Sequence, residues 1–353
     1  MPSFRSGPVT AIIEARPGLV RMLVDLGGPE PERAYALSDV TGPVHVGDRV
    51  VVNTTAVELG LGTGGWHVVH WNLDLDSWSG PGRGHIMKAR YTSLQYDSGA
   101  AEEQHGTLAD ASGIDGMPVV VASLHSQVAA IAAVFAALRP DLRVAYVMTD
   151  GAALPLALSD LVDSMRARAW LIGTITCGHA FGGDLEAVSI HSALVAARHV
   201  LEADVTIVAM GPGIVGTNSV LGHSGIEQGP ILDAVTALGG QPVAAVRASD
   251  ADPRPRHRGV SHHSITALTV AAHTRSTIGV PIGGHTDQLV AELGSAGVTG
   301  RHDVRTVVVP DVVAMFDDAD LDVRTMGRPA AADRLLFDCG AAAAVVALDL
   351  LAC

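Results

Sequence analysis

The sequence predicts an α/β protein in which a small N-terminal β-barrel-like domain precedes a doubly wound, mostly parallel, Rossmann-like sheet. Short Val-rich runs separated by Gly and Pro fill the first part of the chain, and apolar runs alternating with Ala- and Leu-rich segments fill the rest. Aromatic residues are only 4% of the 353 residues, while 48% are hydrophobic, which favours Val-rich strands covered by Ala-rich helices. A chain of this length exceeds one hydrophobic core, so we expect a β domain over 1–75, a connecting segment over 76–117 and an α/β domain over 118–353.

The N-terminal prediction depends on residues 9–73, where turn signals interrupt the Val-rich runs. The clearest strand is 46–53, VGDRVVVN, whose Gly-Asp turn before a strand is typical of small SH3-like and OB-like barrels. The segment 76–117 is rich in Gly, Ser and Asp and has weak periodicity. Within it only 84–97 resembles a strand, so the segment can add a hairpin or an edge strand to either domain.

The α/β prediction depends on six nearly continuous apolar runs, as expected for strands buried on both faces. The expected strands are 119–122, 144–148, 171–176, 205–210, 243–247 and 306–309. Helices are expected at 126–138, 155–167, 185–201, 229–238, 265–274 and 287–295. The apolar stretch 341–351 is too short to span a membrane and contains Asp349, so we expect a buried C-terminal helix.

The charge and the cysteine content limit the classes of partner and the cellular compartment that we expect. The net charge of -14, with 23 basic against 37 acidic residues, argues against nucleic acid as a partner. Cys177, Cys339 and Cys353 are too few for a disulfide framework, which favours a reducing compartment. With no signal-like or membrane-spanning run, we expect a cytoplasmic protein that contacts no membrane. A homo-oligomer is the default expectation for such a protein.

The strongest functional signal is a concentration of histidines and carboxylates in the loops that follow the predicted strands. Right-handed crossovers place those loops at the carboxyl edge of the sheet, where ligands bind in such folds. The residues are His125, Asp150, His179, Asp184, His223, His257, His262 and His263. For any one of the histidines, the alternative is a structural role in which the side chain caps a helix or binds the backbone.

A glycine-rich segment, GPGIVG, follows the strand 205–210 and has the spacing GxGxxG. Its glycines, Gly211, Gly213 and Gly216, allow three interpretations: an anion-binding loop, a tight turn or a dinucleotide fingerprint. The helix that a fingerprint requires does not follow at once. The next motif, GHSG, suggests a nucleophile at Ser224, but its first Gly stands one place too early for GxSxG.

The segment 254–264, RPRHRGVSHHS, concentrates imidazole and guanidinium groups before an apolar helix. One interpretation is a divalent metal as cofactor, with His257, His262, His263 and Asp184 as ligands, although no zinc signature is present. The second is a clamp for a small anionic molecule, with Arg256 and Arg258 as donors and Ser261 capping the helix. The third is a solvated basic loop.

Together these loops predict an enzyme, a hydrolase or transferase, that acts on a small anionic substrate at the carboxyl edge of the sheet. Asp150, His179, His223 and His262 are the expected catalytic residues. Substrate binding is assigned to His125, Ser126, Gly211, Gly213, Gly216, Ser224, Arg256 and Arg258. Two alternatives are a sensor that binds a nucleotide-like ligand while its barrel docks a partner, and an assembly subunit with a relic pocket.

Several phrases together resemble one family over nearly the whole chain: GDRVVVNTTAVELGLGTGG, LHSQ, GHAFGGDLEAVSIHSAL, GPGIVGTNSVLGHSG, HRGVSHHS and VRTMGR. It is an uncharacterised family of proteins of about this length from high-GC Gram-positive bacteria, classed as a domain of unknown function. The resemblance implies a bacterial protein and brings no reaction or cofactor. HRGVSHHS is also similar to the HRGxTHS phrase of certain membrane-bound metal-dependent hydrolases, with Ser261 in the place of Thr and an extra His.

Overall fold

The computed structural model describes residues 1–61, 64–80, 82 and 84–352, and it divides into two compact units, Met1–Gly99 and Ala100–Cys353. The segment 76–117, predicted as a connection, is shared between them. Its first part carries a short hairpin, β6 (Met87–Lys88) with β7 (Tyr96–Asp97), and its second part carries α3 (Ala101–Gln104). Residues 81 and 83 of that segment, and Cys353, lie outside the described residues.

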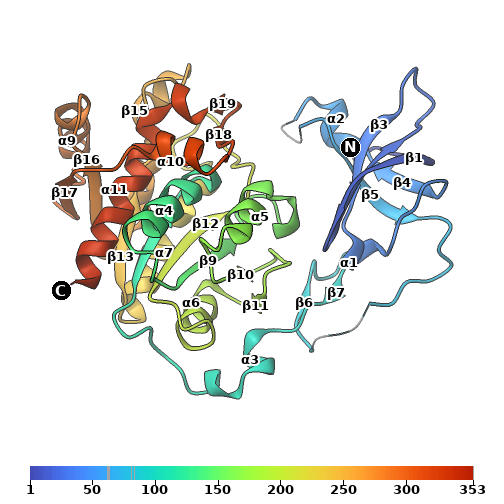
Figure 1. Ribbon diagram of the computed structural model, residues 1–353, viewed down its shortest axis with the longest axis horizontal. Helices are drawn as coiled ribbons and strands as arrows, with labels where there is room; N and C mark the ends of the chain where they lie inside the picture. The colour runs from blue at the N-terminus through green and yellow to red at the C-terminus, as the bar shows by residue number, and fades with distance from the viewer. Residues whose placement is uncertain (62–63, 81, 83, 353) are drawn as a thin grey trace. The chain divides into compact units, whose positions relative to one another are not determined.

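The first unit contains a closed five-stranded barrel, in agreement with the predicted β domain (Figure 1). Its strands are β1 (Phe4–Arg16), β2 (Leu19–Val24), β3 (Glu32–Ala36), β4 (Arg49–Asn53) and β5 (His67–Asn72). Their order is β1-β2-β3-β5-β4, closed by β1 with β4, and only the β3–β5 pair is parallel. This is the strand order of an OB-type barrel. Two one-turn helices, α1 (Ser38–Thr41) and α2 (Thr55–Glu58), connect the strands.

The predicted strand 46–53 is shorter in the structure and begins at Arg49. Gly47 has a φ of 98°, a conformation that few residues other than glycine adopt, and the Asp48 carboxylate accepts a hydrogen bond from the His45 amide. These contacts make a turn before the strand. The barrel interior is filled by side chains that alternate along the strands, among them Met22, Val50 and Val52, all fully buried.

The second unit contains one eight-stranded sheet in which all neighbouring strands are parallel, so the predicted Rossmann-like α/β class is confirmed. The strands are β8 (Pro118–Ala122), β9 (Val144–Thr149), β10 (Gly173–Cys177), β11 (Leu185–Ala187), β12 (Val205–Met210), β13 (Gln241–Ala245), β16 (Thr277–Pro281) and β17 (Asp303–Val307). Their order across the sheet is β11-β10-β9-β12-β8-β13-β16-β17.

The structure contains two strands that were not among the six predicted, and the predicted strand 306–309 begins three residues earlier, as Asp303–Val307. Strand β11 takes the first three residues of the predicted helix 185–201, because Leu185 pairs with Ile175 of β10, and the helix begins only at Ile190. Strand β16 was not predicted, since its short sequence TIGVP contains both Gly and Pro, which are rare inside strands.

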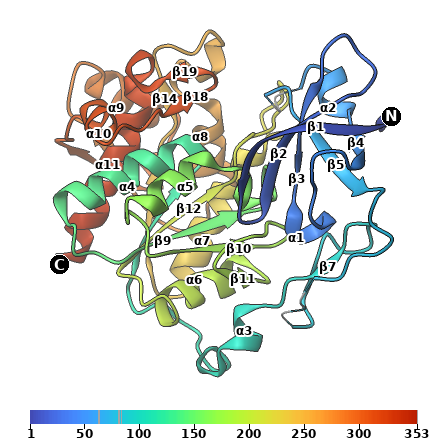
Figure 2. The same cartoon turned by 45° about the vertical axis from the view of Figure 1, so that its right-hand side comes forward.

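Helices cover both faces of the sheet (Figures 1 and 2). One face packs against α4 (His125–Leu138), α5 (Asp160–Ala167), α10 (Val312–Asp318) and α11 (Arg334–Leu351). The other packs against α6 (Ile190–His199), α7 (Gln228–Ala237) and α9 (Thr286–Ser295). Helix α11 contains the predicted segment 341–351 but begins earlier, at Arg334. Within the described residues, no helix combines the length and apolarity needed to cross a bilayer.

Strand β8 occupies the centre of the sheet and is buried along its whole length. Val120 contributes to the core under α4 and α11, and Val121 contributes to the core under α6 and α7. From β8 the chain continues towards β9, and from the neighbouring β13 it continues in the opposite direction, towards β16. The carboxyl ends of β8 and β13 therefore form a topological switch point, the usual ligand position in open α/β sheets.

Candidate functional site

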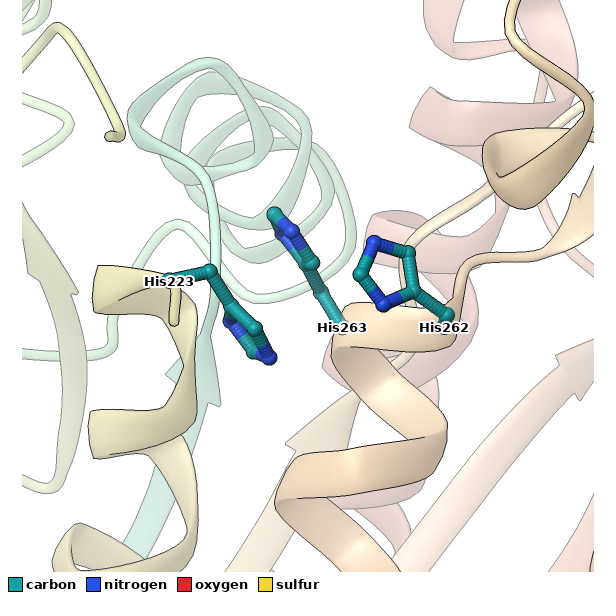
Figure 3. Close-up of side chains that lie close together, drawn as sticks. All are labelled: His223, His262 and His263. Carbon is teal, nitrogen blue, oxygen red and sulfur yellow. The ribbon is translucent and has the colours of Figure 1, made fainter. Parts of the chain in front are cut away.

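Four histidine side chains meet beyond the carboxyl ends of β12 and β13, and Figure 3 shows three of them. His223 precedes the 3-10 turn η3 (Ser224–Glu227), while His262 and His263 begin helix α8 (His262–Thr266). The rings of His223 and His263 stack at 3.8 Å between centroids with an interplanar angle of 6°. The His262 ring lies 4.4 Å from that of His263, and the His257 ring lies 4.8 Å from it. We call these four residues the histidine cluster.

Local contacts fix both sides of the histidine cluster. On one side, the Gln228 side-chain amide donates to the carbonyls of Val121 and Ala245, which ties the start of α7 to strands β8 and β13. On the other side, the Ser261 hydroxyl caps α8 by accepting from the His263 amide and also contacts His257 Nδ1 at 2.7 Å. Gly216 leaves little room for a side chain, because a Cβ there would lie 3.1 Å from the His223 Cβ and 3.5 Å from the His263 ring.

The cluster contains buried nitrogen atoms for which the described residues supply no hydrogen-bond partner. Both ring nitrogens of His223 and Nε2 of His262 make no hydrogen bond of normal geometry, although His223 is only 5% exposed. A weaker contact of His223 with the Val220 backbone opposes the lowering of its pKa by burial. Buried polar atoms in native proteins are nearly always bound to protein, water, an ion or a ligand. Three such atoms in one cluster therefore indicate a site built to bind something.

Guanidinium groups surround the cluster. Arg247, which follows β13 and is 2% exposed, places Nη1 3.2 Å from His263 Nδ1. Its other terminal nitrogen lies 3.6 Å from the buried Asp252 carboxylate, which Arg254 also binds at 2.8 Å. Nε of Arg256 is buried and has no partner among the described residues. Because Asp252 is shared among three arginines, the third being Arg328 at 3.8 Å, the surroundings of the cluster carry an excess of positive charge.

Burial is the main reason that the imidazole pKa values are lowered. It lowers the pKa of His263 to about 2, with further contributions from His223 and Arg247, and that of His257 to about 3, assisted by Arg247 and Arg254. The pKa values of His223 and His262 are also lowered, first by burial and then by neighbouring positive groups. All four imidazoles are therefore neutral at pH 7.

A carboxylate that the sequence analysis missed lies in the same crossover, at Glu227. Its Oε1 accepts a 2.5 Å hydrogen bond from the Thr149 hydroxyl, and burial, opposed by that bond but assisted by Asp150, raises its pKa to about 7. Asp150 accepts from the His179 amide at 2.9 Å. A Cβ at Gly151 would lie 2.5 Å from the Glu227 carboxylate, so a larger residue there would displace that side chain. Only the place of Glu227 after GHSG, among the other polar loops, could have indicated it.

Several predicted site residues lie apart from the histidine cluster. His125 is held inside the fold by the Tyr146 hydroxyl, the Met210 carbonyl and the Ser159 hydroxyl, and Ser126 follows it in the first turn of α4. Asp184, predicted as a metal ligand, accepts from Thr174 and Arg166 beside the amino-terminal half of β10. The structure therefore does not bring Asp184 to the three histidines with which the sequence analysis grouped it.

The remaining predicted residues lie around the loop after β12. At Gly211, a Cβ would lie 2.4 Å from the Ala153 carbonyl oxygen. Gly213 has a φ of 94°. Close packing therefore explains Gly211, and the positive φ explains Gly213. The Ser224 hydroxyl accepts from the Val215 amide, so it has a local structural role. Arg258 is exposed and donates to the Asp250 carbonyl.

The fold and the site define a two-unit protein with an OB-type barrel and a Rossmann-like sheet that carries a buried histidine cluster. The chain belongs to a family described as "Protein of unknown function (DUF3866)", whose model matches residues 33–344, and this confirms the resemblance to a family of unknown function. No curated protein and no solved structure gives a significant match.

Proposed function

We propose that the histidine cluster is the active site of an enzyme, a hydrolase or transferase, that acts on a small anionic substrate. The observation that supports this most is the set of buried nitrogens of His223 and His262 that make no hydrogen bond of normal geometry with the described residues, close to the positive charge of Arg256. An anion compensates the excess positive charge, and the free ring nitrogens are available to the reacting groups.

Anion binding and acid–base chemistry support each other in this arrangement. The neighbouring arginines lower the pKa values of His223 and His262, so a bound anion, by opposing that charge, raises them towards their usual range. A neutral imidazole nitrogen that holds no metal ion can accept a proton from an attacking water or hydroxyl group, and its conjugate acid can return that proton to the leaving group. Glu227 offers a second proton-transfer group in the same crossover.

The proposal is tested by assaying the purified chain with chromogenic phosphate and carboxylate esters, together with two single variants, His223→Ala and His262→Ala. We expect each variant to lose roughly 100-fold or more of the turnover, the usual scale for removing an acid–base group. His199→Ala is the control, because His199 is at the end of α6 and contacts only the Gly113 carbonyl. Equal activity in all four proteins would remove the cluster from the mechanism.

The non-catalytic alternative gives a different result. If an anionic ligand raises the melting temperature of the wild-type chain but not of His223→Ala, and is recovered unchanged, the site binds without catalysis and the protein is a sensor.

A further inference from the structure

We infer that His223, His262 and His263 form a binding site for one divalent transition-metal ion of the zinc type. One nitrogen from each of the three rings lies within 4.8 Å of the others. Tetrahedral zinc sites take imidazole nitrogens at about 2.0–2.1 Å and close to the plane of each ring, so the stacked rings of His223 and His263 must turn relative to each other before all three nitrogens coordinate one ion. This ligand set differs from the one expected from sequence, because it includes His223 and omits Asp184.

The unpartnered nitrogens are the second observation that indicates a metal. His302, a buried histidine of the same unit, has both ring nitrogens bound: Nδ1 contacts Ser276, and Nε2 contacts the Leu268 carbonyl. His223 and His262, in contrast, present buried nitrogens that make no hydrogen bond of normal geometry with the described residues. Three imidazoles with no carboxylate favour zinc, cobalt, nickel or copper over magnesium or calcium, which prefer oxygen ligands.

The neighbouring guanidinium constrains how the metal binds. A metal on His263 Nε2 requires the proton on Nδ1, so Arg247 can no longer donate to Nδ1. The Asp252 carboxylate, 3.6 Å away, is available to receive the guanidinium instead. Because Arg247 and Arg256 add positive charge next to the ion, the fourth coordination position is best filled by an anion.

His257 is not among the three residues whose nitrogens lie within 4.8 Å of one another. Its Nδ1 lies 2.7 Å from the Ser261 hydroxyl, and its ring lies 5.1 Å from that of His262. It is a neighbour of the site with the same side chain and a similar burial, so it provides a matched control within the cluster.

The test is titration of the metal-free chain with Co²⁺, followed by its visible absorption and by calorimetry. We expect one ion per chain with the intense bands of tetrahedral cobalt. His223→Ala and His262→Ala should weaken binding at least 100-fold, whereas His257→Asn and the surface variant His199→Ala should keep a stoichiometry of one. Circular dichroism of each variant establishes that it is folded. No cobalt binding by the folded wild-type chain, or loss of binding in His257→Asn with binding kept in His223→Ala, would overturn the ligand set.

A second measurement tests the link between metal and anion. Repeating the Co²⁺ titration in sulfate and in chloride at equal ionic strength should give affinity about tenfold higher in sulfate, within the usual range of coupling between two sites. This coupling rests on the proposed anionic substrate, whereas the stoichiometry does not. Metal binding without sulfate coupling would therefore contradict the proposed substrate class while keeping the metal site, and loss of both would overturn the metal site itself.

Discussion

Replacing His125 by Gln should change how the stability of the α/β unit depends on pH. Burial lowers the His125 pKa from 6.5 to about 4, opposed by the hydrogen bond to the Met210 carbonyl. The unfolded chain therefore takes up a proton at higher pH than the folded chain. The neutral ring stabilises the folded state fully above the unfolded pKa, and this contribution is lost as the pH falls from about 6.5 towards 4.

The size of the effect follows from that shift. A difference of about 2.5 pKa units corresponds to about 3.4 kcal/mol in full, of which about 2.5 kcal/mol is lost between about pH 7.5 and pH 4.5. At the higher pH, His125→Gln should be less stable than the wild type by about 1–2 kcal/mol, because contacts with Ser159 and Tyr146 are lost. At about pH 4.5, His125→Gln should instead be more stable than the wild type.

The measurement is urea unfolding at both pH values, followed by far-ultraviolet circular dichroism. This signal reports mainly the α/β unit, because the helices longer than one turn all lie there. Comparing the two proteins at each pH cancels the contributions of the other histidines, and His199→Gln serves as the exposed control. A stability difference between wild type and His125→Gln that stays constant with pH would refute the reasoning.

Three further predictions concern packing and charge. Gly178→Ala should lower the free energy of unfolding by about 1–3 kcal/mol, because φ is 66° and the new Cβ would lie 2.3 Å from the Asp150 carboxylate; an unchanged melting temperature by calorimetry would contradict this. Phe337→Ala should lower the free energy of unfolding in urea by about 3–5 kcal/mol, because the ring is fully buried and packs edge-on against Phe316 at 5.7 Å between centroids. A decrease of less than about 1 kcal/mol would mean that α11 moves to fill the space that the ring leaves. Asp252→Asn should destabilise by about 3–5 kcal/mol, because Arg247 keeps its buried charge without a counter-ion; a near-neutral effect would show that solvent reaches the guanidinium.

The sequence could predict the strands that form long apolar runs, but not β16 or the short edge strand β11. Strands β8, β9 and β12 are continuous apolar runs, whose burial on both faces leaves a clear signal. Strand β11 has only three residues, one of them Glu186, whose carboxylate is bonded to Thr176. A pattern of that length has no periodicity to read, so pairing with β10 decides its conformation.

For the candidate site, too, the sequence could predict one part and not another. Alternation of strands and helices was enough to place the histidine-bearing loops at one edge of the sheet. Which histidines meet depends on strand order, because β12 and β13 flank β8 and so bring the crossover with His223 next to the one with His262 and His263. Strand order is set by contacts between distant segments, which no local pattern in a single sequence records. Glu227 was missed for the same reason, since its partner Thr149 belongs to β9.

The central position of β8 also has a consequence for biosynthesis. Both of its neighbours, β12 and β13, come after β9, β10 and β11 in the chain, so a nascent chain that has reached β11 holds a completed β8 with neither edge paired. The exposed edges of an apolar strand such as PVVVA can pair with other chains and cause aggregation. Translation pauses or truncations before β12 therefore leave the most aggregation-prone segment of the unit unprotected, and chaperone demand should be greatest at that stage of synthesis.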